Sequence, residues 1–328
     1  AGLVNSETVG SVTLASTGQV ATADVVGSPY AIVASNATGG TFSPSNYTIS
    51  YVDGALTVTP APLTITAQDV SKLYGQAPSL SGFDTAGLVN SDTVGSVTLI
   101  SDGQAATADV AGSLYAIVAS NAIGGSFTPG NYTISYVNGA LAVTPAPLTI
   151  TAQDVSKVYG QAPTLSGFDT AGLVNSETVG SVTLASTGQV TTADVVGSPY
   201  AIVASDATGG SFTPGNYSIG YVDGALTVTP APLTITAQDV SKVYGQAPTL
   251  SGFDTAGLVN SDTVASVTLA SNGQVATAGV AGSPYAIVAS NATGDSFTPG
   301  NYTISYVNGA LTVTPASLTI TAQDVSKV

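Results

Sequence analysis

The sequence lacks cysteine, histidine, methionine, tryptophan and arginine, and its only basic residues are four lysines. Without histidine it has no side chain that changes charge near neutral pH, and without cysteine it has no thiolate nucleophile. The usual ligands of zinc and other transition metals are missing for the same reason. Serine and threonine are abundant, but no histidine is available as their base. These absences predict that the protein is not an enzyme and has no catalytic or cofactor-binding residues.

Positive charge and long apolar runs are also scarce. The four lysines stand against 19 acidic residues, so the 328 residues carry a net charge of −15. Nucleic-acid binding depends on cationic side chains that displace counterions from phosphates, so nucleic acid is excluded as a partner. Threonine, serine and glycine interrupt the apolar runs well below the roughly 18 residues that a spanning helix needs, which predicts no membrane insertion. The chain begins without methionine or a secretory signal pattern, so we expect a segment of a longer protein.

A repeat of 85 residues is the main feature that the sequence does have. The segment Ala-Gly-Leu-Val-Asn begins at Ala1, Ala86, Ala171 and Ala256. A unit of this length is typical of a small domain, so separate modules are expected in preference to one continuous core. Prolines mark the points where the last strand of one module is followed by the first strand of the next. They predict three complete modules, preceded by a partial module that lacks its first strand and followed by the first strand of a further module. In chain order these five segments are 1–62, 63–147, 148–232, 233–317 and 318–328.

Within each unit, apolar and polar residues alternate with the period of two that is typical of β-strands. Residues 48–52 and 55–59 alternate on either side of Asp53-Gly54, a strong hairpin signal, so a hairpin is expected there. Further strands are expected at 96–100 and 115–120. The pattern predicts an all-β tandem array, an elongated rod of β-sandwich-like modules with about six or seven short strands each. The alternative is a β-grasp-like module.

Aromatic residues recur at six positions of the unit and have two interpretations. The positions are represented by Tyr30, Phe42, Tyr47, Tyr51, Tyr74 and Phe83. Without tryptophan or methionine, a module must bury tyrosine, phenylalanine and aliphatic residues, which favours a role in the core. If the rings faced outward, they would instead form platforms for stacking sugars, and many weak sites would give avidity for host or matrix glycans.

One lysine occurs in each unit, within the motif Gln-Asp-Val-Ser-Lys. Lys72, Lys157 and Lys242 are candidates for intramolecular isopeptide bonds, with an acid such as Asp69 or Asp84 assisting proton transfer. The alternative is an exposed lysine that pairs with an aspartate and discourages pairing at a strand edge. Intact mass distinguishes the two, because each isopeptide bond releases ammonia or water.

Acidic residues raise the further possibility of calcium, a cation that prefers oxygen ligands. The candidates stay acidic in every copy that contains them and are represented by Asp69, Asp84 and Asp92. No EF-hand spacing is present, so such a site would have to be assembled in three dimensions. A second group of acids is expected to serve turns or solubility, because one copy has glycine instead. This group consists of Asp24, Asp109 and Asp194, with Gly279 in the fourth copy.

The two end segments suggest a mode of assembly between identical chains. Segment 318–328 is a strand without a module, and segment 1–62 is a module without that strand. These are the two halves needed for strand donation from one chain to another. The donated side chains would be Leu318, Ile320, Ala322 and Val325. The alternative is that the ends of the sequence fall without regard to module boundaries.

Three ordered motifs resemble those of the MBG domain of the Tyr-Gly-x type. They are Leu-Thr-Ile-Thr-Ala-Gln-Asp-Val-Ser-Lys-Val-Tyr-Gly at 148–160, Gly-Leu-Val-Asn-Ser-Glu-Thr at 172–178, and the stretch from Asn216-Tyr217 to Thr229-Pro230-Ala231. The resemblance implies tandem stalk modules of large secreted bacterial adhesins and filamentous-haemagglutinin-like exoproteins. It therefore implies an extracellular location on the bacterial cell surface and no catalytic residues. The absence of cysteine fits a secreted stalk that relies on packing.

Three functions are compatible with these observations. The first is a structural repeat region of an adhesin or surface fibre, which projects a binding tip or forms a filament and whose partners are neighbouring modules. The second is a multivalent carbohydrate-binding array. The third is a self-assembling filament subunit joined by strand donation between identical chains.

Overall fold

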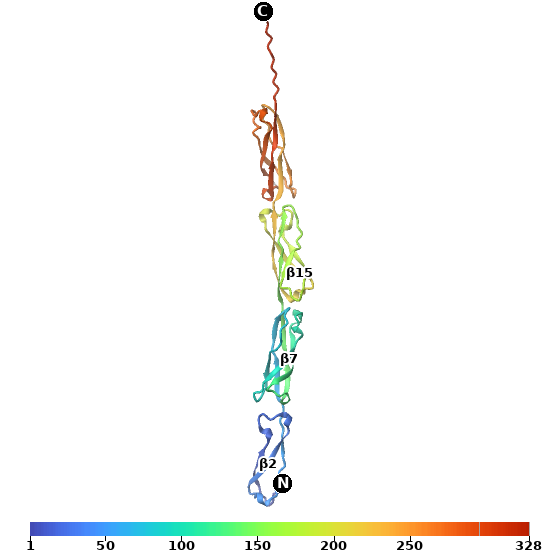
Figure 1. Cartoon of the computed structure of the whole chain (residues 1–328), viewed down its shortest axis with the longest axis vertical. Coiled ribbons are helices and arrows are strands. Elements are labelled where there is room, and N and C mark those ends of the chain that lie inside the picture. The colour runs from blue at the N-terminus through green and yellow to red at the C-terminus, as the bar shows by residue number, and fades with distance from the viewer. Residues whose placement is uncertain (295, 328) are drawn as a thin grey trace. The chain divides into compact units, whose positions relative to one another are not determined.

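The computed structural model describes residues 1–294 and 296–327. Contacts between residues divide the chain into two compact units. The first unit contains residues 1–147 together with the short segments 174–176 and 213–218, and the second contains the remaining residues from Leu148 onward. Successive repeats form successive groups of strands along the chain, coloured from blue to red in Figure 1. No α-helix lies within the described residues.

The second repeat shows how a module of seven strands is built. Its strands are β4 (Ala61–Ala67), β5 (Val70–Leu73), β6 (Phe83–Ala86), β7 (Val94–Ile100), β8 (Tyr115–Gly125), β9 (Tyr132–Val137) and β10 (Gly139–Thr144). One sheet has the order β6-β4-β9 and the other β5-β10-β8-β7. The β4–β9 and β5–β10 pairs are parallel, and the other pairs are antiparallel. Each sheet therefore joins a strand from the start of the repeat to one from its end.

The third and fourth repeats have the same arrangement. The strands of the third are β11 (Ala146–Ala152), β12 (Val155–Val158), β13 (Phe168–Ala171), β14 (Val179–Ala185), β15 (Tyr200–Gly210), β16 (Tyr217–Val222) and β17 (Gly224–Thr229). The strands of the fourth are β18 (Ala231–Ala237), β19 (Val240–Val243), β20 (Phe253–Ala256), β21 (Ser266–Ala270), β22 (Tyr285–Thr293), β23 (Tyr302–Val307) and β24 (Gly309–Thr314). A single residue, Pro230, separates β17 from β18.

The first repeat has one three-stranded sheet, of order β1-β2-β3. These strands are β1 (Val9–Ala15), β2 (Tyr30–Gly40) and β3 (Gly54–Leu56). They correspond to β7, β8 and β10 of the second repeat, one period further along the chain.

Short 3-10 helices connect several strands. They are η1 (Thr17–Gln19), η2 (Val25–Gly27), η3 (Pro44–Asn46), η4 (Asp102–Gln104), η5 (Val110–Gly112), η6 (Pro129–Asn131), η7 (Thr187–Gln189), η8 (Val195–Gly197), η9 (Pro214–Asn216), η10 (Val280–Gly282) and η11 (Pro299–Asn301). Three types recur with the repeat. The second type begins after the variable aspartate position, and the third has the sequence Pro-x-Asn.

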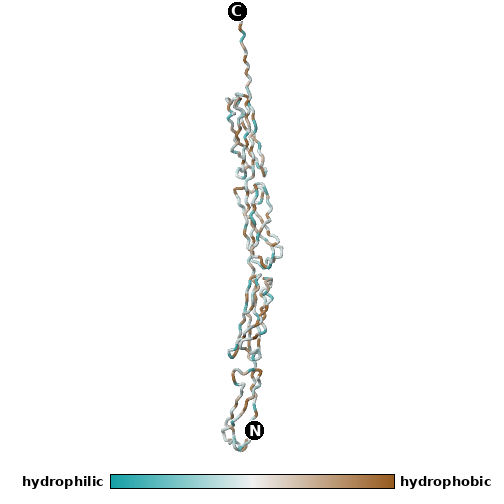
Figure 2. Tube along the Cα trace, in the orientation of Figure 1, coloured by the Kyte–Doolittle hydropathy of each residue, from teal (hydrophilic) through white to brown (hydrophobic). Residues whose placement is uncertain are grey.

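The core lies between the two sheets of a repeat. In β4 the alternate residues Leu63, Ile65 and Ala67 are buried, as the period of two predicts. Leu63 and Ile65 pack in one cluster with Phe127 and with Tyr132 at the start of β9. Figure 2 shows the same short-range mixing of hydrophobic and hydrophilic residues along each repeat.

The predicted all-β array of sandwich-like modules is confirmed, with seven strands in each of the last three repeats. The strands expected at 96–100 and 115–120 are present as β7 and β8. The β-grasp alternative does not describe these modules, because an α-helix packed on the sheet is part of that fold and the described residues form none.

The hairpin prediction around the Asp-Gly or Asn-Gly pair is wrong. In the second repeat the flanking strands are β9 and β10, and they lie in different sheets. A Cβ atom on Gly139 would lie 2.5 Å from the carbonyl oxygen of Ala67, so the glycine lets the chain cross close to the end of β4. The pair therefore marks a crossing from one sheet to the other. Alternation alone could not reveal this, because it shows which residues face the core but not which strands pair.

Candidate functional site

The repeated lysine is buried. Lys157 is 4% exposed, and Lys72 and Lys242 are buried to the same degree. The Nζ of Lys157 donates hydrogen bonds to the main-chain oxygens of Gln161 and Val190. Burial lowers the pKa of Lys72 and Lys157. The expectation of an exposed lysine paired with aspartate is wrong, because main-chain carbonyls bind the ammonium group inside the repeat. The isopeptide bond stays a prediction for intact mass to test.

We expect Lys157→Met to lower the free energy of unfolding of the third repeat by about 1–3 kcal/mol. Methionine keeps most of the aliphatic stem, but the two carbonyl oxygens lose their donor in a buried setting. Urea unfolding followed by tyrosine fluorescence measures the change. Lys327→Met is the matched control, because Lys327 occupies the same motif position but is exposed, and it should leave stability unchanged. Equal stability of Lys157→Met and the parent chain would contradict a structural role for the ammonium group.

The three calcium candidates accept hydrogen bonds from different donors. Ala140 N–H donates to Asp69 at 2.7 Å, Gln68 Nε2 to Asp84 at 3.0 Å and the Tyr132 hydroxyl to Asp92 at 2.6 Å. Each of these carboxylates therefore takes part in a separate hydrogen bond. Within residues 1–294 and 296–327, no three acidic side chains are grouped closely enough to hold a metal ion.

The strand-donation candidates lie in a segment without secondary structure. Residues 315–327 follow β24 and are exposed, including Leu318, Ile320, Ala322 and Val325. The strand expected from Leu318 onward is thus not formed, since these residues have no sheet edge beside them in the described part of the chain. Strand donation between chains stays a prediction.

The aromatic positions divide between core and surface. Phe42, Tyr74 and Tyr132 are buried, as the core interpretation predicts. Tyr136 on β9 is partly exposed, and its hydroxyl accepts a hydrogen bond from the N–H of Ala122 on β8. The hydroxyl of a β9 residue therefore binds a β8 N–H outside the β7–β8 register pairs and links the two sheets.

The contacts that the sequence did not predict lie where the third repeat meets the fourth, entirely within the second unit. Asn301, at the end of η11, has a side chain that is only 2% exposed. Its Oδ1 accepts a hydrogen bond from the N–H of Val195 at 2.9 Å, and its Nδ2 donates to Oδ1 of Asp194 at 2.6 Å. Val195 begins η8, so the fourth repeat caps a 3-10 helix of the third. We call this pair of hydrogen bonds the amide latch.

Two tyrosines and one carboxylate form the centre of this junction. The rings of Tyr159 and Tyr302 meet edge to face, with centroids 5.5 Å apart. Both hydroxyls donate to Oδ2 of Asp262, at 3.3 and 2.7 Å. Burial raises the pKa of Tyr302 to about 12; the main-chain N–H of Val259 opposes this shift, and the hydrogen bond to Asp262 adds to it. The Tyr302 hydroxyl therefore stays a donor to Asp262 throughout the neutral range.

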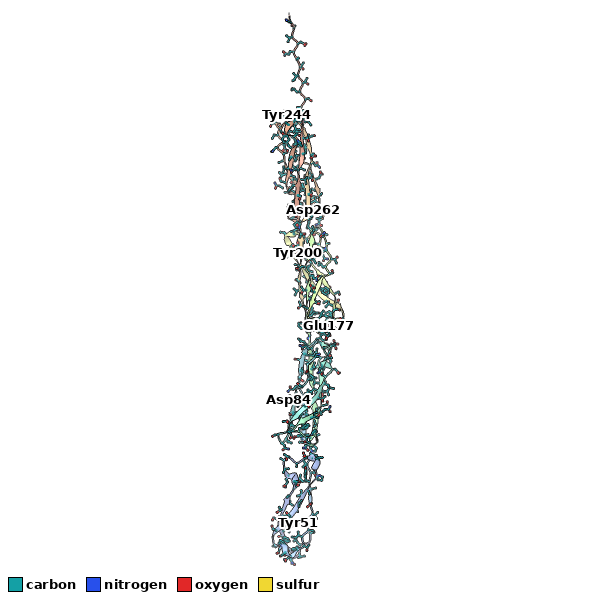
Figure 3. All side chains as sticks on the ribbon, viewed as in Figure 1. Tyr51, Asp84, Glu177, Tyr200, Tyr244 and Asp262 are labelled. Atoms are coloured by element: carbon teal, nitrogen blue, oxygen red, sulfur yellow. The ribbon has the colours of Figure 1, made fainter. Side chains whose placement is uncertain are left out.

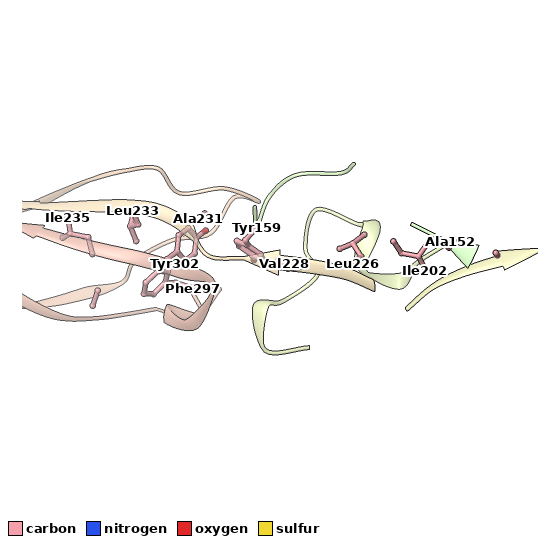
Figure 4. Packing of buried hydrophobic residues seen from close by; sticks show 12 residues of the cluster. Ala152, Tyr159, Ile202, Leu226, Val228, Ala231, Leu233, Ile235, Phe297 and Tyr302 are labelled. Carbon is pink, nitrogen blue, oxygen red and sulfur yellow. The ribbon is translucent and has the colours of Figure 1, made fainter. Parts of the chain in front are cut away.

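The buried core continues through this junction. One cluster contains Leu226 and Val228 of β17 together with Leu233 and Ile235 of β18, and Tyr159 and Tyr302 lie between them (Figure 4). The expectation of modules with separate cores is therefore wrong here, because the one-residue link at Pro230 places the two cores in contact.

The glycine of the Tyr-Gly motif allows the closest approach at the junction. Gly160 has a φ of +92°, and a Cβ atom there would lie 2.7 Å from Cγ2 of Val259 in the fourth repeat. Its N–H and the side chain of Asn260 both donate to the main-chain oxygen of Thr191, at 3.1 and 3.0 Å. One carbonyl thus ties the third repeat to the fourth.

The amide latch recurs in the first unit. Asn131 binds Val25 N–H at 2.9 Å and Asp24 at 2.6 Å. In the same unit, Asn216 of segment 213–218 binds Val110 N–H at 3.0 Å and Asp109 at 2.7 Å. The latch therefore recurs with nearly the same distances wherever the structure places an asparagine of this type beside a preceding repeat.

Exposure of the motif tyrosine measures what a following repeat covers. Tyr244 in the fourth repeat is 49% exposed, whereas the equivalent Tyr159 is 5% exposed. Figure 3 places Tyr244 at the end of the fourth repeat from which residues 315–327 leave, and Asp262 at its opposite end. The junction thus converts a half-exposed ring into a buried one.

Sequence reasoning missed the latch because it assigned the variable aspartates to turns or solubility. Asp194 does precede a 3-10 helix, but its carboxylate binds the next repeat. Asn301 and Asp194 are 107 positions apart, more than one 85-residue period, so the pair is not visible within a single repeat. The available signal was the Pro-x-Asn-Tyr motif, which contains an asparagine in every copy.

Comparisons with known proteins identify the repeat. No curated protein matches the chain. Drosophila N-cadherin EC1-3 is 11% identical with a TM-score of 0.25, over 76% of this chain and 98% of that chain. The N-terminal four Ig domains of Dscam1 isoform 9.44 are 12% identical with a TM-score of 0.19, over 89% and 81%. These scores are too low to define a shared arrangement.

Among the described residues, no helix is both long and apolar enough to cross a bilayer.

One protein-family model, described as MBG domain (YGX type), matches residues 1–57, 63–142, 148–227 and 233–312. These four matches take in the Tyr-Gly motifs and the strands that form the sandwich. The chain belongs to the MBG domain (YGX type) family and contains four tandem copies of that domain.

Proposed function

We propose that this chain is a stalk region of an extracellular bacterial adhesin or surface fibre, and that it bears load while it projects a binding tip or forms a filament. The observation that carries the proposal is the parallel pairing of strands from opposite ends of the repeat in each of the last three repeats. In the fourth repeat, β18 pairs with β23 through six residue pairs, and β19 pairs with β24 through four.

This pairing places tension on many hydrogen bonds at once. A pull along the chain enters the fourth repeat at the start of β18 and leaves at the end of β24. Because β23 continues directly into β24, the pull draws the parallel strands β18 and β23 in opposite directions along their length. The hydrogen bonds across this pair are then loaded together, in shear, and the β19–β24 pair is loaded in the same way. A strand peeled from one end would break its bonds one after another at lower force.

The composition and the junctions also support a structural role. The chain has no histidine or cysteine, and its buried lysines bind main-chain carbonyls. Consecutive repeats are joined by short proline-containing links and by the amide latch. These features provide mechanical connections between repeats.

Single-molecule force spectroscopy tests the load-bearing role with two pulling directions on the full chain. Since the sequence has no cysteine, paired substitutions define the attachment points without interference. Thr229→Cys with Ala316→Cys pulls the fourth repeat in shear, and Gln238→Cys with Asn308→Cys peels β23 from β18. We expect a clearly higher unfolding force in the first geometry. Equal forces would contradict the proposal.

A glycan array separates the stalk from the carbohydrate-binding alternative. A stalk gives no binding, whereas a multivalent lectin gives binding that rises with the number of repeats. Glycan binding together with equal unfolding forces would favour the alternative.

A further inference from the structure

In the first three repeats, the residue before the second 3-10 helix faces the next repeat. Asp194 stands immediately before η8, and its carboxylate binds Asn301 of the fourth repeat. Asp24 and Asp109 have the same role in the first unit. The acceptor is thus supplied by one repeat and the donor by the following one.

Asparagine suits the other side of the latch because its amide presents a donor and an acceptor side by side. Asn301 gives its oxygen to Val195 N–H and its nitrogen to Asp194; the side chain of Asn301 is only 2% exposed, whereas Asp194 is exposed. A buried polar group that loses its partner bears the full cost of desolvation. The latch therefore depends on both residues of the pair.

The fourth repeat has glycine where the other three have aspartate. Gly279 has a φ of −87°, and a Cβ atom there would meet nothing within 4 Å, so neither backbone strain nor crowding requires glycine. The local fold is otherwise retained. The Tyr285 hydroxyl donates to the Gly279 carbonyl at 2.9 Å, as Tyr200 does to Asp194 in the third repeat. The replacement therefore removes the acceptor for a following repeat and leaves the turn intact.

We infer that this single position sets the stiffness of each junction in an MBG array. A repeat with aspartate here binds the Pro-x-Asn-Tyr end of the next repeat through both bonds of the latch. A repeat with glycine offers only the main-chain N–H, so the amide nitrogen of the incoming asparagine has no carboxylate to bind, and the junction is a hinge. The partner surface is the Pro-x-Asn-Tyr end of another repeat, and aspartate or glycine determines how firmly it is held.

Distance measurements between spin labels test the inference in the full chain. Val203→Cys and Val288→Cys place labels at equivalent, half-exposed positions of β15 and β22, on either side of the junction. The parent chain should give a narrow distance distribution. Asp194→Gly converts this junction to the Gly279 type and should abolish the narrow distribution. An unchanged distribution in Asp194→Gly would overturn the inference.

Variants of Asn301 and of both latch residues control for a general loss of structure at the junction. Asn301→Asp places two carboxylates against each other, so the junction should open at neutral pH. A neighbouring like charge raises a carboxyl pKa above its usual value of about 4, and the protonated form restores a donor, so this variant should close again as the pH falls through that raised pKa. The other titratable side chains at the junction are Asp262, Tyr159 and Tyr302, so the parent chain is measured over the same pH range.

The double variant Asp194→Asn/Asn301→Asp reverses the positions of the amide and the carboxylate. The amide at position 194 then donates to the carboxylate at position 301, which also accepts from Val195 N–H. We expect its distance distribution to be as narrow at neutral pH as that of the parent. A double variant as broad as Asn301→Asp would overturn the inference. The proposed stalk function is tested separately, because the unfolding force of a single repeat depends on its own strand pairs and not on the latch.

Discussion

Leu233→Ala should lower the free energy of unfolding by about 2–5 kcal/mol, the largest effect expected of a single side-chain truncation in this chain. Leu233 lies on β18, is 1% exposed and belongs to the buried cluster that continues from the third repeat into the fourth. Alanine removes buried apolar surface and leaves a cavity in packing that the short link at Pro230 prevents from collapsing freely. Urea unfolding followed by tyrosine fluorescence measures the loss, since no tryptophan competes with the signal.

The matched control is Val307→Ala on β23 of the same repeat. Val307 is 46% exposed, so the substitution removes little buried surface and should change stability by no more than about 0.5 kcal/mol. Because the cluster is shared, Leu233→Ala should also reduce the stability of the third repeat. Loss confined to the fourth repeat would mean that the two cores are energetically separate despite their contact.

Gly160→Ala should open the junction between the third and fourth repeats. The left-handed backbone at φ +92° disfavours any side chain by about 1–2 kcal/mol. The added Cβ would also lie 2.7 Å from Val259, and crowding in a packed site adds about 1–3 kcal/mol. We expect the free energy of unfolding to fall by the sum of these two costs, about 2–5 kcal/mol. We also expect the Tyr159 ring to become accessible to quenchers of tyrosine fluorescence.

Gly245→Ala separates the two contributions. Gly245 is the same motif glycine in the fourth repeat and has a φ of +94°, but a Cβ atom there would meet nothing within 4 Å. Its substitution should show the backbone cost alone. The difference between the two variants therefore measures contact with the following repeat. If Gly160→Ala costs no more than Gly245→Ala, the tight approach of Val259 does not contribute to stability.

The fold was predictable from the sequence to the level of individual strands and the residues that face the core. The period of two identified the residues that face the core, such as Leu63 and Ile65, because burial of one face imposes that period on any sheet. Strand pairing was not predictable in the same way. The Asn138-Gly139 step has the composition of a hairpin turn, yet β9 and β10 belong to different sheets, because β9 pairs in parallel with β4 and β10 pairs in parallel with β5.

The candidate site was less predictable because its parts come from different repeats. Neither the burial of Lys157 nor the bond between Asn301 and Asp194 leaves a local pattern: a lysine is ordinarily a surface residue, and Asp194 precedes a turn where aspartate is common. Comparison of the four copies did show that this position varies, because Gly279 replaces aspartate in the fourth. Its role could be assigned only once the structure showed that the asparagine of the next repeat lies opposite it.

The one-residue link at Pro230 also affects how such a repetitive chain avoids misfolding. The first strands of the second, third and fourth repeats have the same sequence, Ala-Pro-Leu-Thr-Ile-Thr-Ala, so any of them would fit equally well into a neighbour's sheet. A β18 strand that took the place of β11 would lie parallel to β16, as it does to β23 in its own repeat, and a parallel neighbour needs a connection of about a dozen residues or more. After β17, the single residue Pro230 leaves no room for such a connection, so β18 is directed into its own repeat before it can exchange with the identical strand of the one before. Lengthening this link would remove the barrier and expose the array to strand exchange between neighbours.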